Sequence, residues 1–203
     1  MKTKICGITN LRDAKFAIEY GAWALGFNFY KPSPRFLQIE QAGEIIKDLP
    51  KTIVKVGLFV DQDYATIHQI MEDLELDLAQ VYQDYDCSID AKKSMIFVIQ
   101  PFLAEELPPL NVLREYGYVL IDAPRGRNDV YGGSGKLANW EIASELSRDV
   151  KLILAGGLNS HNIANATSAV HPWGVDVCSG VESSPGIKDP ILLKQFLNQT
   201  SYE

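Results

Sequence analysis

Short apolar runs alternate with segments of helical periodicity along the whole of this 203-residue chain. Eight runs have the length and composition of β-strands, at 3–6, 24–29, 54–60, 78–81, 95–100, 118–122, 151–155 and 175–178. Segments with helical spacing follow them in turn, at 11–20, 39–48, 63–75, 88–93, 104–116, 138–148, 160–170 and 190–198. Strands that are apolar on both faces and separated by helices form a parallel sheet covered by helices.

Eight such units in so short a chain predict an α/β fold, a closed (β/α)₈ TIM barrel with short loops, in which residues 1–203 form a single domain. An open, doubly wound sheet is the alternative, although no Gly-x-Gly-x-x-Gly follows the first strand as a dinucleotide site would require. Asp61, Asn159 and Asp189 are expected to cap helices, and Gly21 to end the first helix in the left-handed conformation.

Charge and cysteine content exclude several classes of function. A net charge of −7 without any basic run argues against nucleic-acid partners and against an anionic membrane surface. Three cysteines that lie far apart without metal-ligand spacing indicate neither a disulfide framework nor a metal site, and are typical of a reducing compartment. The chain enters strand-like sequence without a leader, and no apolar stretch reaches the ~18 residues of a membrane span, so we expect a cytoplasmic protein.

Chemically unusual residues collect at the predicted carboxyl ends of strands, where barrels of this kind build their active sites. Cys6 ends the first strand, Asp122 ends the sixth, and Asp176 lies near the end of the eighth. A carboxylate at the end of an apolar strand gains the character of a general acid, because burial raises its pKa. Taken singly, a cysteine such as Cys6 is more often a small buried hydrophobe, whereas Asp122 could equally be a cap or an ion-pair partner.

Strand parity adds an expectation about the barrel interior. Lys4 and Cys6 share one face of their strand, as Asp176 and Cys178 do on theirs. The first and eighth strands are neighbours in a closed barrel, so Lys4 and Asp176 should approach each other beneath the site. An ammonium group at that position would favour the thiolate form of Cys6.

Three loops carry further signals. Gly156 and Gly157 follow the seventh strand and Ser179 and Gly180 the eighth, the two loops with which such barrels often bind phosphate through backbone amides. A third glycine run, at 131–136, lies in a long polar connection that we expect to act as a lid rather than as a Walker motif. After the second strand, prolines stiffen a loop that presents Arg35, which could either fork onto a carboxylate or remain a solvated surface cation.

Six motifs in order along the predicted barrel loops resemble the phosphoribosylanthranilate isomerase family of tryptophan biosynthesis. They are Lys4-Ile5-Cys6-Gly7-Ile8-Thr9; Gly26-Phe27-Asn28-Phe29 with Ser33-Pro34-Arg35; Val56-Gly57-Leu58-Phe59-Val60; Asp122 with Gly132-Gly133-Ser134-Gly135-Lys136; Ala155-Gly156-Gly157-Leu158; and Gly174-Val175-Asp176-Val177-Cys178-Ser179-Gly180-Val181-Glu182. The resemblance implies that Cys6 is the general base and Asp122 the general acid. It further implies that Arg35 grips the anthranilate carboxylate, with Gln80 and Asp176 also contacting substrate. The phosphate would then sit on the amides of the two glycine loops.

The same resemblance implies an Amadori rearrangement of an aminoaldose to an aminoketose, without metal or organic cofactor, by a monomer or homodimer acting on a small phosphorylated substrate. The residues suit that chemistry, because Asp122 can protonate the ribose ring oxygen and a Cys6 thiolate can then remove the C2 proton of the resulting Schiff base.

The chain departs from the family pattern at the mouth of the predicted site. Gln80-Val81-Tyr82-Gln83 stands where the family usually reads Gln-Leu-His-Gly, and Trp140 follows Asn139 where an aspartate is common. Two other functions remain open: the related isomerase of the histidine pathway, whose carboxylate base Cys6 argues against, and a degenerate barrel that binds a sugar phosphate without converting it. Cys178 is interpreted as a packing residue.

Overall fold

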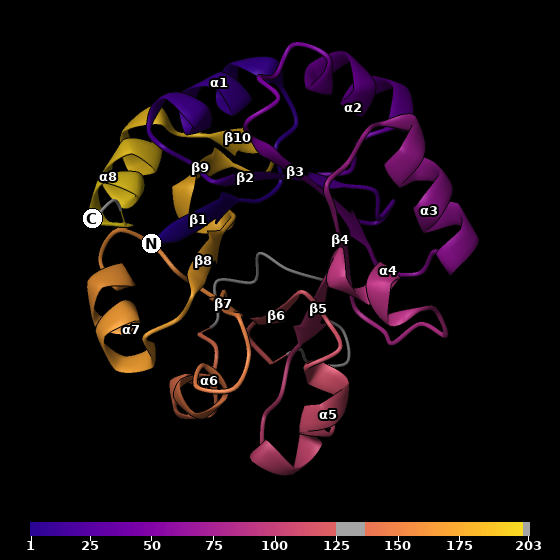
Figure 1. Cartoon of the computed structure of the whole chain (residues 1–203). Helices are drawn as coiled ribbons and strands as arrows, with labels where there is room; N and C mark the ends of the chain where they lie inside the picture. The colour runs from indigo at the N-terminus through magenta and orange to yellow at the C-terminus, as the bar shows by residue number, and fades with distance from the viewer. Residues whose placement is uncertain (125–136, 201–203) are drawn as a thin grey trace.

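The computed structural model describes residues 1–124 and 137–200 of the chain. Eight parallel strands, each hydrogen-bonded to the next, close into a barrel in the order β1 to β8, and helices surround it (Figure 1). The strands are β1 (Lys2–Ile5), β2 (Ala24–Asn28), β3 (Val54–Phe59), β4 (Leu78–Val81), β5 (Met95–Ile99), β6 (Tyr118–Ile121), β7 (Leu152–Leu154) and β8 (Gly174–Val177). The predicted TIM barrel is therefore confirmed, and the open sheet is excluded.

The helices follow the strands in turn. They are α1 (Leu11–Glu19), α2 (Ile39–Ile46), α3 (Tyr64–Asp73), α4 (Ile89–Lys93), α5 (Leu110–Leu113), α6 (Trp140–Leu146), α7 (Ile163–Val170) and α8 (Pro190–Thr200). The helix expected at 104–116 is instead a 3-10 turn, η1 (Ala104–Glu106), and the short α5. Pro108 and Pro109 separate the two, because proline lacks the N–H that a continuous helix needs. Among the described residues, no helix has the length and apolar character needed to cross a membrane.

Two helix starts differ from the prediction. The cap of α3 is Asp63 rather than Asp61, and its carboxylate accepts a hydrogen bond from the Thr66 amide. Helix α7 begins after Asn162 rather than directly after Asn159. Asp189 does accept bonds from the first amides of α8, and Gly21 has a φ of +90° at the end of α1, as expected.

Alternation along each strand divides the apolar side chains into two sets. One set faces outward and forms the main core between barrel and helices, with Phe27, Val81 and Ile121 among its members. The other set faces the barrel axis, where Ala24, Val56, Leu78, Ile96, Leu120 and Ile153 pack together. The same inward parity continues toward the carboxyl ends of the strands, so residues two positions further along point into the mouth of the barrel.

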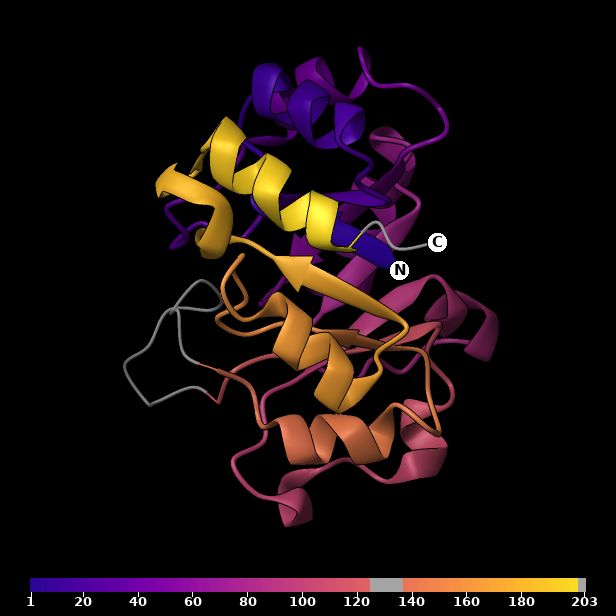
Figure 2. The same ribbon diagram turned by 90° about the vertical axis from the view of Figure 1, so that its left-hand side faces the viewer.

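A small element follows β8 that the sequence did not indicate. A 3-10 turn, η2 (Ser179–Val181), leads into an antiparallel hairpin of β9 (Glu182–Ser184) and β10 (Ile187–Lys188). Figure 2 shows this hairpin beyond the arrowhead of β8, at the end of the barrel where the strands finish. The closing helix α8 then packs beside β1, where the Thr3 hydroxyl donates to that of Thr200 at 2.8 Å.

Candidate active site

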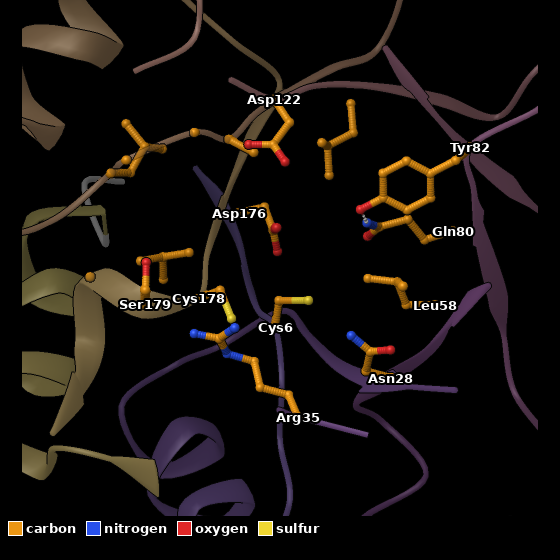
Figure 3. A pocket seen from close by; sticks show the side chains of 17 residues that line it. Cys6, Asn28, Arg35, Leu58, Gln80, Tyr82, Asp122, Asp176, Cys178 and Ser179 are labelled. Atoms are coloured by element: carbon orange, nitrogen blue, oxygen red, sulfur yellow. Dashed lines mark hydrogen bonds between the residues drawn. The ribbon is translucent and has the colours of Figure 1, made fainter. Parts of the chain in front are cut away.

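A pocket opens at the carboxyl ends of the strands (Figure 3). Its lining contains every residue predicted for the site, namely Cys6, Arg35, Gln80, Asp122, Gly156, Gly157, Asp176, Ser179 and Gly180. Asn28, Leu58, Tyr82 and Cys178 join them from neighbouring strands. Residues from across the sequence therefore converge because their strands end at the same rim.

Cys6 and Asp122 lie one residue beyond the strands that were predicted to include them, since β1 ends at Ile5 and β6 at Ile121. Their amides nevertheless continue the barrel ladder, the Cys6 N–H bonding to Val177 O at 2.9 Å and the Asp122 N–H to Ile99 O at 3.0 Å. The backbone of both residues is thus held as firmly as a strand, while the side chains project into the pocket.

A buried ion pair forms the floor of the pocket. Lys4 is fully buried, and its Nζ lies 2.8 Å from Asp176 Oδ1, directly across the β1–β8 pairing. The approach expected from strand parity is confirmed. Burial alone would lower the pKa of Lys4, but the charge and hydrogen bond of Asp176 raise it above its ordinary value. Lys4 therefore carries a fixed positive charge beneath Cys6.

Cys6 sits above that charge and is only 6% exposed. A hydrogen bond from Cys178 lowers the pKa of Cys6 from 9.0 to about 7, with help from the charge of Lys4 and against the effect of burial. The thiol of Cys178 has a pKa well above its ordinary value, chiefly because it stays protonated as the partner of Cys6. Cys178 packs against the small cluster that contains Cys6, and its Sγ lies 3.8 Å from Glu182 Oε1.

Gly26 on β2 provides the room for this arrangement. A Cβ at that position would lie 3.1 Å from Cys6 Sγ and 3.1 Å from Lys4 Nζ. The absence of a side chain thus lets the thiol and the ammonium share one side of the barrel interior.

Asp122 faces the thiol from the opposite side of the pocket (Figure 3). Burial raises its pKa from 3.8 to about 6, and the nearby charge of Asp176 adds to the rise. Two hydrogen bonds oppose that rise, from the Ala123 amide at 2.8 Å and from Gln100 Nε2 at 3.4 Å. The pocket thus contains a carboxyl group made less acidic and a thiol made more acidic than usual.

Gln80 and Tyr82 form the wall between β3 and β5. Gln80 is 2% exposed, and its Nε2 lies 3.4 Å from Tyr82 Oη, whereas its Oε1 is buried without a hydrogen-bond partner among the residues that the structure describes. A buried acceptor of this kind is costly unless it receives a hydrogen bond. Burial raises the pKa of Tyr82 well above 10.0, and the charge of Asp122 adds to it, so the phenol is neutral.

Arg35 is buried rather than solvated, and its guanidinium forks onto a carboxylate of the chain itself. Its Nε and Nη2 lie 2.9 Å and 2.6 Å from the two oxygens of Glu182, which begins β9. The position of Arg35 follows from β2, because Asn28 Nδ2 donates to Ser33 Oγ at 3.0 Å and Ser33 Oγ in turn accepts from the Arg35 amide at 3.2 Å.

The two glycine loops after β7 and β8 pack against each other. A Cβ on Gly180 would lie 1.9 Å from Leu158 O, and one on Gly156 would lie 2.7 Å from the Ala123 amide, so both approaches require glycine. Gly156 and Gly157 have φ values of +80° and +61°. Side chains fix the loop further, since Asn162 Nδ2 donates to Gly157 O at 2.9 Å.

Two charged residues behind the pocket, Glu182 and Lys188, were not predicted from the sequence, and both belong to the hairpin after β8. The glycine run at 131–136, expected to be a lid, lies outside the residues that the structure describes. Within the described residues, 1–124 and 137–200, no cluster of His, Cys, Asp and Glu side chains could hold a metal ion.

The sequence of this chain matches one family of known proteins along nearly its whole length. A model of the family "N-(5'phosphoribosyl)anthranilate (PRA) isomerase" matches residues 3–199. N-(5'-phosphoribosyl)anthranilate isomerase of Pelobacter propionicus is 41% identical over 199 residues, which are 97% of this chain and 94% of that protein.

Solved structures agree over the same length. Phosphoribosyl anthranilate isomerase from Thermotoga maritima has a TM-score of 0.85 at 34% identity, covering 98% of this chain and 98% of that one. A phosphoribosyl anthranilate isomerase in complex with reduced 1-(o-carboxyphenylamino)-1-deoxyribulose 5-phosphate has a TM-score of 0.82 at 31% identity, covering 98% of this chain and 97% of that one.

Proposed function

Because this chain belongs to the N-(5'-phosphoribosyl)anthranilate isomerase family, an isomerase family of tryptophan biosynthesis, we propose that Asp122 and Cys6 are the acid and base of its reaction. The substrate is N-(5'-phosphoribosyl)anthranilate and the product 1-(2-carboxyphenylamino)-1-deoxyribulose 5-phosphate. The observation that carries the proposal is the placement of the Cys6 thiol and the Asp122 carboxyl on opposite sides of one pocket, above the buried Lys4–Asp176 pair. The pKa of Asp122 is raised to about 6 and that of Cys6 is lowered to about 7, in the directions that an acid and a base require.

Ring opening is the step assigned to Asp122. Its protonated carboxyl donates to the ribose ring oxygen while the bond between that oxygen and C1 breaks, and the anthranilate nitrogen lone pair forms a C=N bond to C1. Burial supports this role, because it keeps part of the Asp122 population protonated near neutral pH.

Proton abstraction is the step assigned to Cys6. The positive charge on the Schiff-base nitrogen acidifies the proton on C2, and the thiolate removes it to leave an enolamine. The enolamine then becomes the ketone as its C2 hydroxyl loses a proton to solvent and C1 gains one. The proton that Cys6 took returns through solvent to Asp122, so both groups regain their starting protonation states. The Lys4 ammonium supports this step, since its charge stabilises the thiolate while its hydrogen bond goes to Asp176 at 2.8 Å.

Substrate binding uses the remaining groups of the pocket. The phosphate lies against the glycine loops, where Gly157 and Gly180 present backbone amides. Arg35 meets the anthranilate carboxylate through Nη1, because Glu182 already engages Nε and Nη2. Gln80 accepts a hydrogen bond from the substrate through Oε1, which is otherwise unpaired among the described residues. Asp176 lines the same pocket and contacts the ribose.

The purified protein is to be mixed with N-(5'-phosphoribosyl)anthranilate while the anthranilate-type fluorescence is followed. We expect a time-dependent loss of fluorescence proportional to protein concentration. Saturable binding without any loss would instead indicate a degenerate sugar-phosphate-binding barrel. Turnover of the aminoaldose of the histidine pathway at a comparable rate would show that the pocket does not select the anthranilate ring.

A further inference from the structure

A second buried lysine approaches Cys6 from the hairpin that follows β8. Lys188, at the end of β10, is 3% exposed, and the proposed function uses none of its atoms. Its Nζ lies 2.6 Å from the backbone oxygen of Cys6, 3.3 Å from that of Cys178 and 2.9 Å from Glu182 Oε1. All three donors of the ammonium are thereby directed at the two residues that carry the thiols and at the carboxylate that holds Arg35.

The backbone of Lys188 is fixed on both sides. Its amide donates to Asp13 Oδ2 at 2.7 Å, and Asp13 is itself held at the start of α1 by Asn10. The next amide, that of Asp189, donates to Val181 O at 2.9 Å. The ammonium is therefore presented from a rigid support, which is what a group that orients others requires.

The contacts of Lys188 connect three parts of the site. The Cys6 and Cys178 carbonyls lie just beyond the ends of β1 and β8, so one ammonium bridges the backbone of the two thiol-bearing residues. Glu182, buried and shared between Lys188 and Arg35, has a pKa below its ordinary value, because the Arg35 hydrogen bonds and the Lys188 charge outweigh the effect of burial. Removal of Lys188 would thus disturb the thiol pair and the arginine together.

We propose that Lys188 is a positioning residue, which holds together the backbone ends that carry the Cys6 and Cys178 side chains and, through Glu182, directs Arg35 into the pocket. The proposal rests on the proposed function, in which Cys6 is the base. The positive charge of Lys188 also favours the Cys6 thiolate. Among residues 1–124 and 137–200, the other titratable or charged groups around Cys6 include Lys4, Arg35, Tyr82, Asp122, Asp176 and Cys178.

The test compares Lys188→Met with a matched control, Lys92→Met. Lys92 is likewise buried, at 7% exposure, and pairs with two carboxylates, Asp84 at 2.8 Å and Glu115 at 2.9 Å, but it lies on α4 away from the pocket. Both variants lose a buried ammonium, so a purely structural role predicts similar consequences for both. The readouts are kcat, KM and the pH dependence of Cys6 alkylation by iodoacetamide, measured by mass spectrometry on the peptide that contains Cys6.

Lys188→Met is expected to move the midpoint of Cys6 alkylation upward by about one pH unit, because an opposite charge near a titrating group typically changes its pKa by that much or more. We also expect kcat to fall about tenfold or more and KM to rise, since both the base and Arg35 lose their alignment. Lys92→Met should leave the midpoint and kcat per folded molecule unchanged. An unchanged midpoint and kcat in folded Lys188→Met would overturn the proposal.

A double variant, Lys188→Met with Glu182→Gln, covers the case in which the single variant fails to fold, because it leaves no unpaired buried carboxylate. The raised alkylation midpoint is expected to persist in the double variant, and a wild-type midpoint there would count against Lys188. The alkylation readout needs no turnover. A shifted midpoint in a protein whose wild type converts no substrate would therefore reject the proposed function while retaining the positioning role.

Discussion

The two ends of the barrel are built from the same eight strands and differ completely in character. At the amino ends of the strands, Trp23, Tyr118 and Trp173 close the interior, with Trp173 meeting Trp23 edge-on at 5.0 Å and Tyr118 at 4.8 Å between ring centroids. At the carboxyl ends, the interior holds an ion pair, two thiols and a carboxyl group instead. Aromatic rings stabilise mainly through buried area and packing, whereas each buried charged or polar group needs a partner.

The contrast indicates that the aromatic end of the barrel contributes mainly to stability and the polar end mainly to the reaction. The inward apolar layer, which includes Ala24, Val56 and Ile96, lies between the two ends and isolates them. Changes at the aromatic end should therefore affect unfolding and leave the pH dependence of activity alone. Changes at the polar end should affect activity and its pH dependence, and stability only where a buried charge loses its partner.

Cys6→Ala should have the largest effect on activity. Loss of a general base typically costs 10²- to 10⁴-fold, so kcat for N-(5'-phosphoribosyl)anthranilate should fall by at least about 10²-fold. The small side chain is replaced by one that fits the same space, and the thermal midpoint should change little. Fluorescence kinetics measure kcat, and a thermal melt on the same sample measures the midpoint. Substantial retained turnover would contradict the role of Cys6 as the base.

Asp176→Asn should have the largest effect on stability at the polar end. It leaves the fully buried Lys4 without its carboxylate, and breaking a buried pair typically costs about 3–5 kcal/mol of unfolding free energy. Urea unfolding measures the loss. The control is Asp149→Asn, whose partner Arg114 is 55% exposed, and which should cost less than about 1 kcal/mol. Equal losses in the two variants would contradict the account.

Trp173→Ala tests the aromatic end. Truncation of a fully buried Trp typically costs about 3–5 kcal/mol, and because Trp173 is only partly buried we expect a loss of about 2–3 kcal/mol. The kcat per folded molecule and the pH profile should match the wild type. A shifted pH profile in this variant would show that the apolar layer does not separate the two ends.

Cys178→Ala should have the smallest effect on unfolding, and its effect on the pKa of Cys6 should have a definite sign. The variant removes the hydrogen bond that chiefly lowers the pKa of Cys6, so that pKa should rise from about 7 back toward 9.0. Since Cys6 then titrates further above Asp122, at about 6, the alkaline limb of kcat/KM should move to higher pH. For each pH unit that the limb moves, the maximum of kcat/KM should fall about tenfold, or about 1.4 kcal/mol. An alkaline limb at the same pH as in the wild type would show that a group other than Cys6 sets this limb.

Much of the polar end could be predicted from the sequence, because it depends on strand order and on parity. Lys4 and Asp176 were paired by those two rules alone, and the glycine loops were located because barrels place ligands after strands seven and eight. Cys178, two residues beyond Asp176 on the same face, was available to the same reasoning, but parity does not specify its contacts with Glu182 and Lys188.

The hairpin that carries Glu182 and Lys188 could not be predicted. Its strands have three and two residues within a segment rich in serine and glycine, which is typical of a loop, and only tertiary packing against α1 and β8 orders it. The fork of Arg35 onto Glu182 was missed for the same reason: the sequence indicated a carboxylate partner but not which one. The helical pattern at 104–116 also gave a wrong prediction, because the two prolines divide the one expected helix into a 3-10 turn and α5.

The pH dependence of kcat/KM, measured side by side for the wild type and Asp122→Asn, tests most directly the claim that the polar end holds a paired base and acid. The wild type should give a bell-shaped profile with limbs near pH 6 and pH 7, set by Asp122 and Cys6. Asp122→Asn should be slower throughout and should lose the alkaline fall, rising to a plateau as Cys6 ionises. A variant that keeps the full bell would contradict the assignment of Asp122 as the acid.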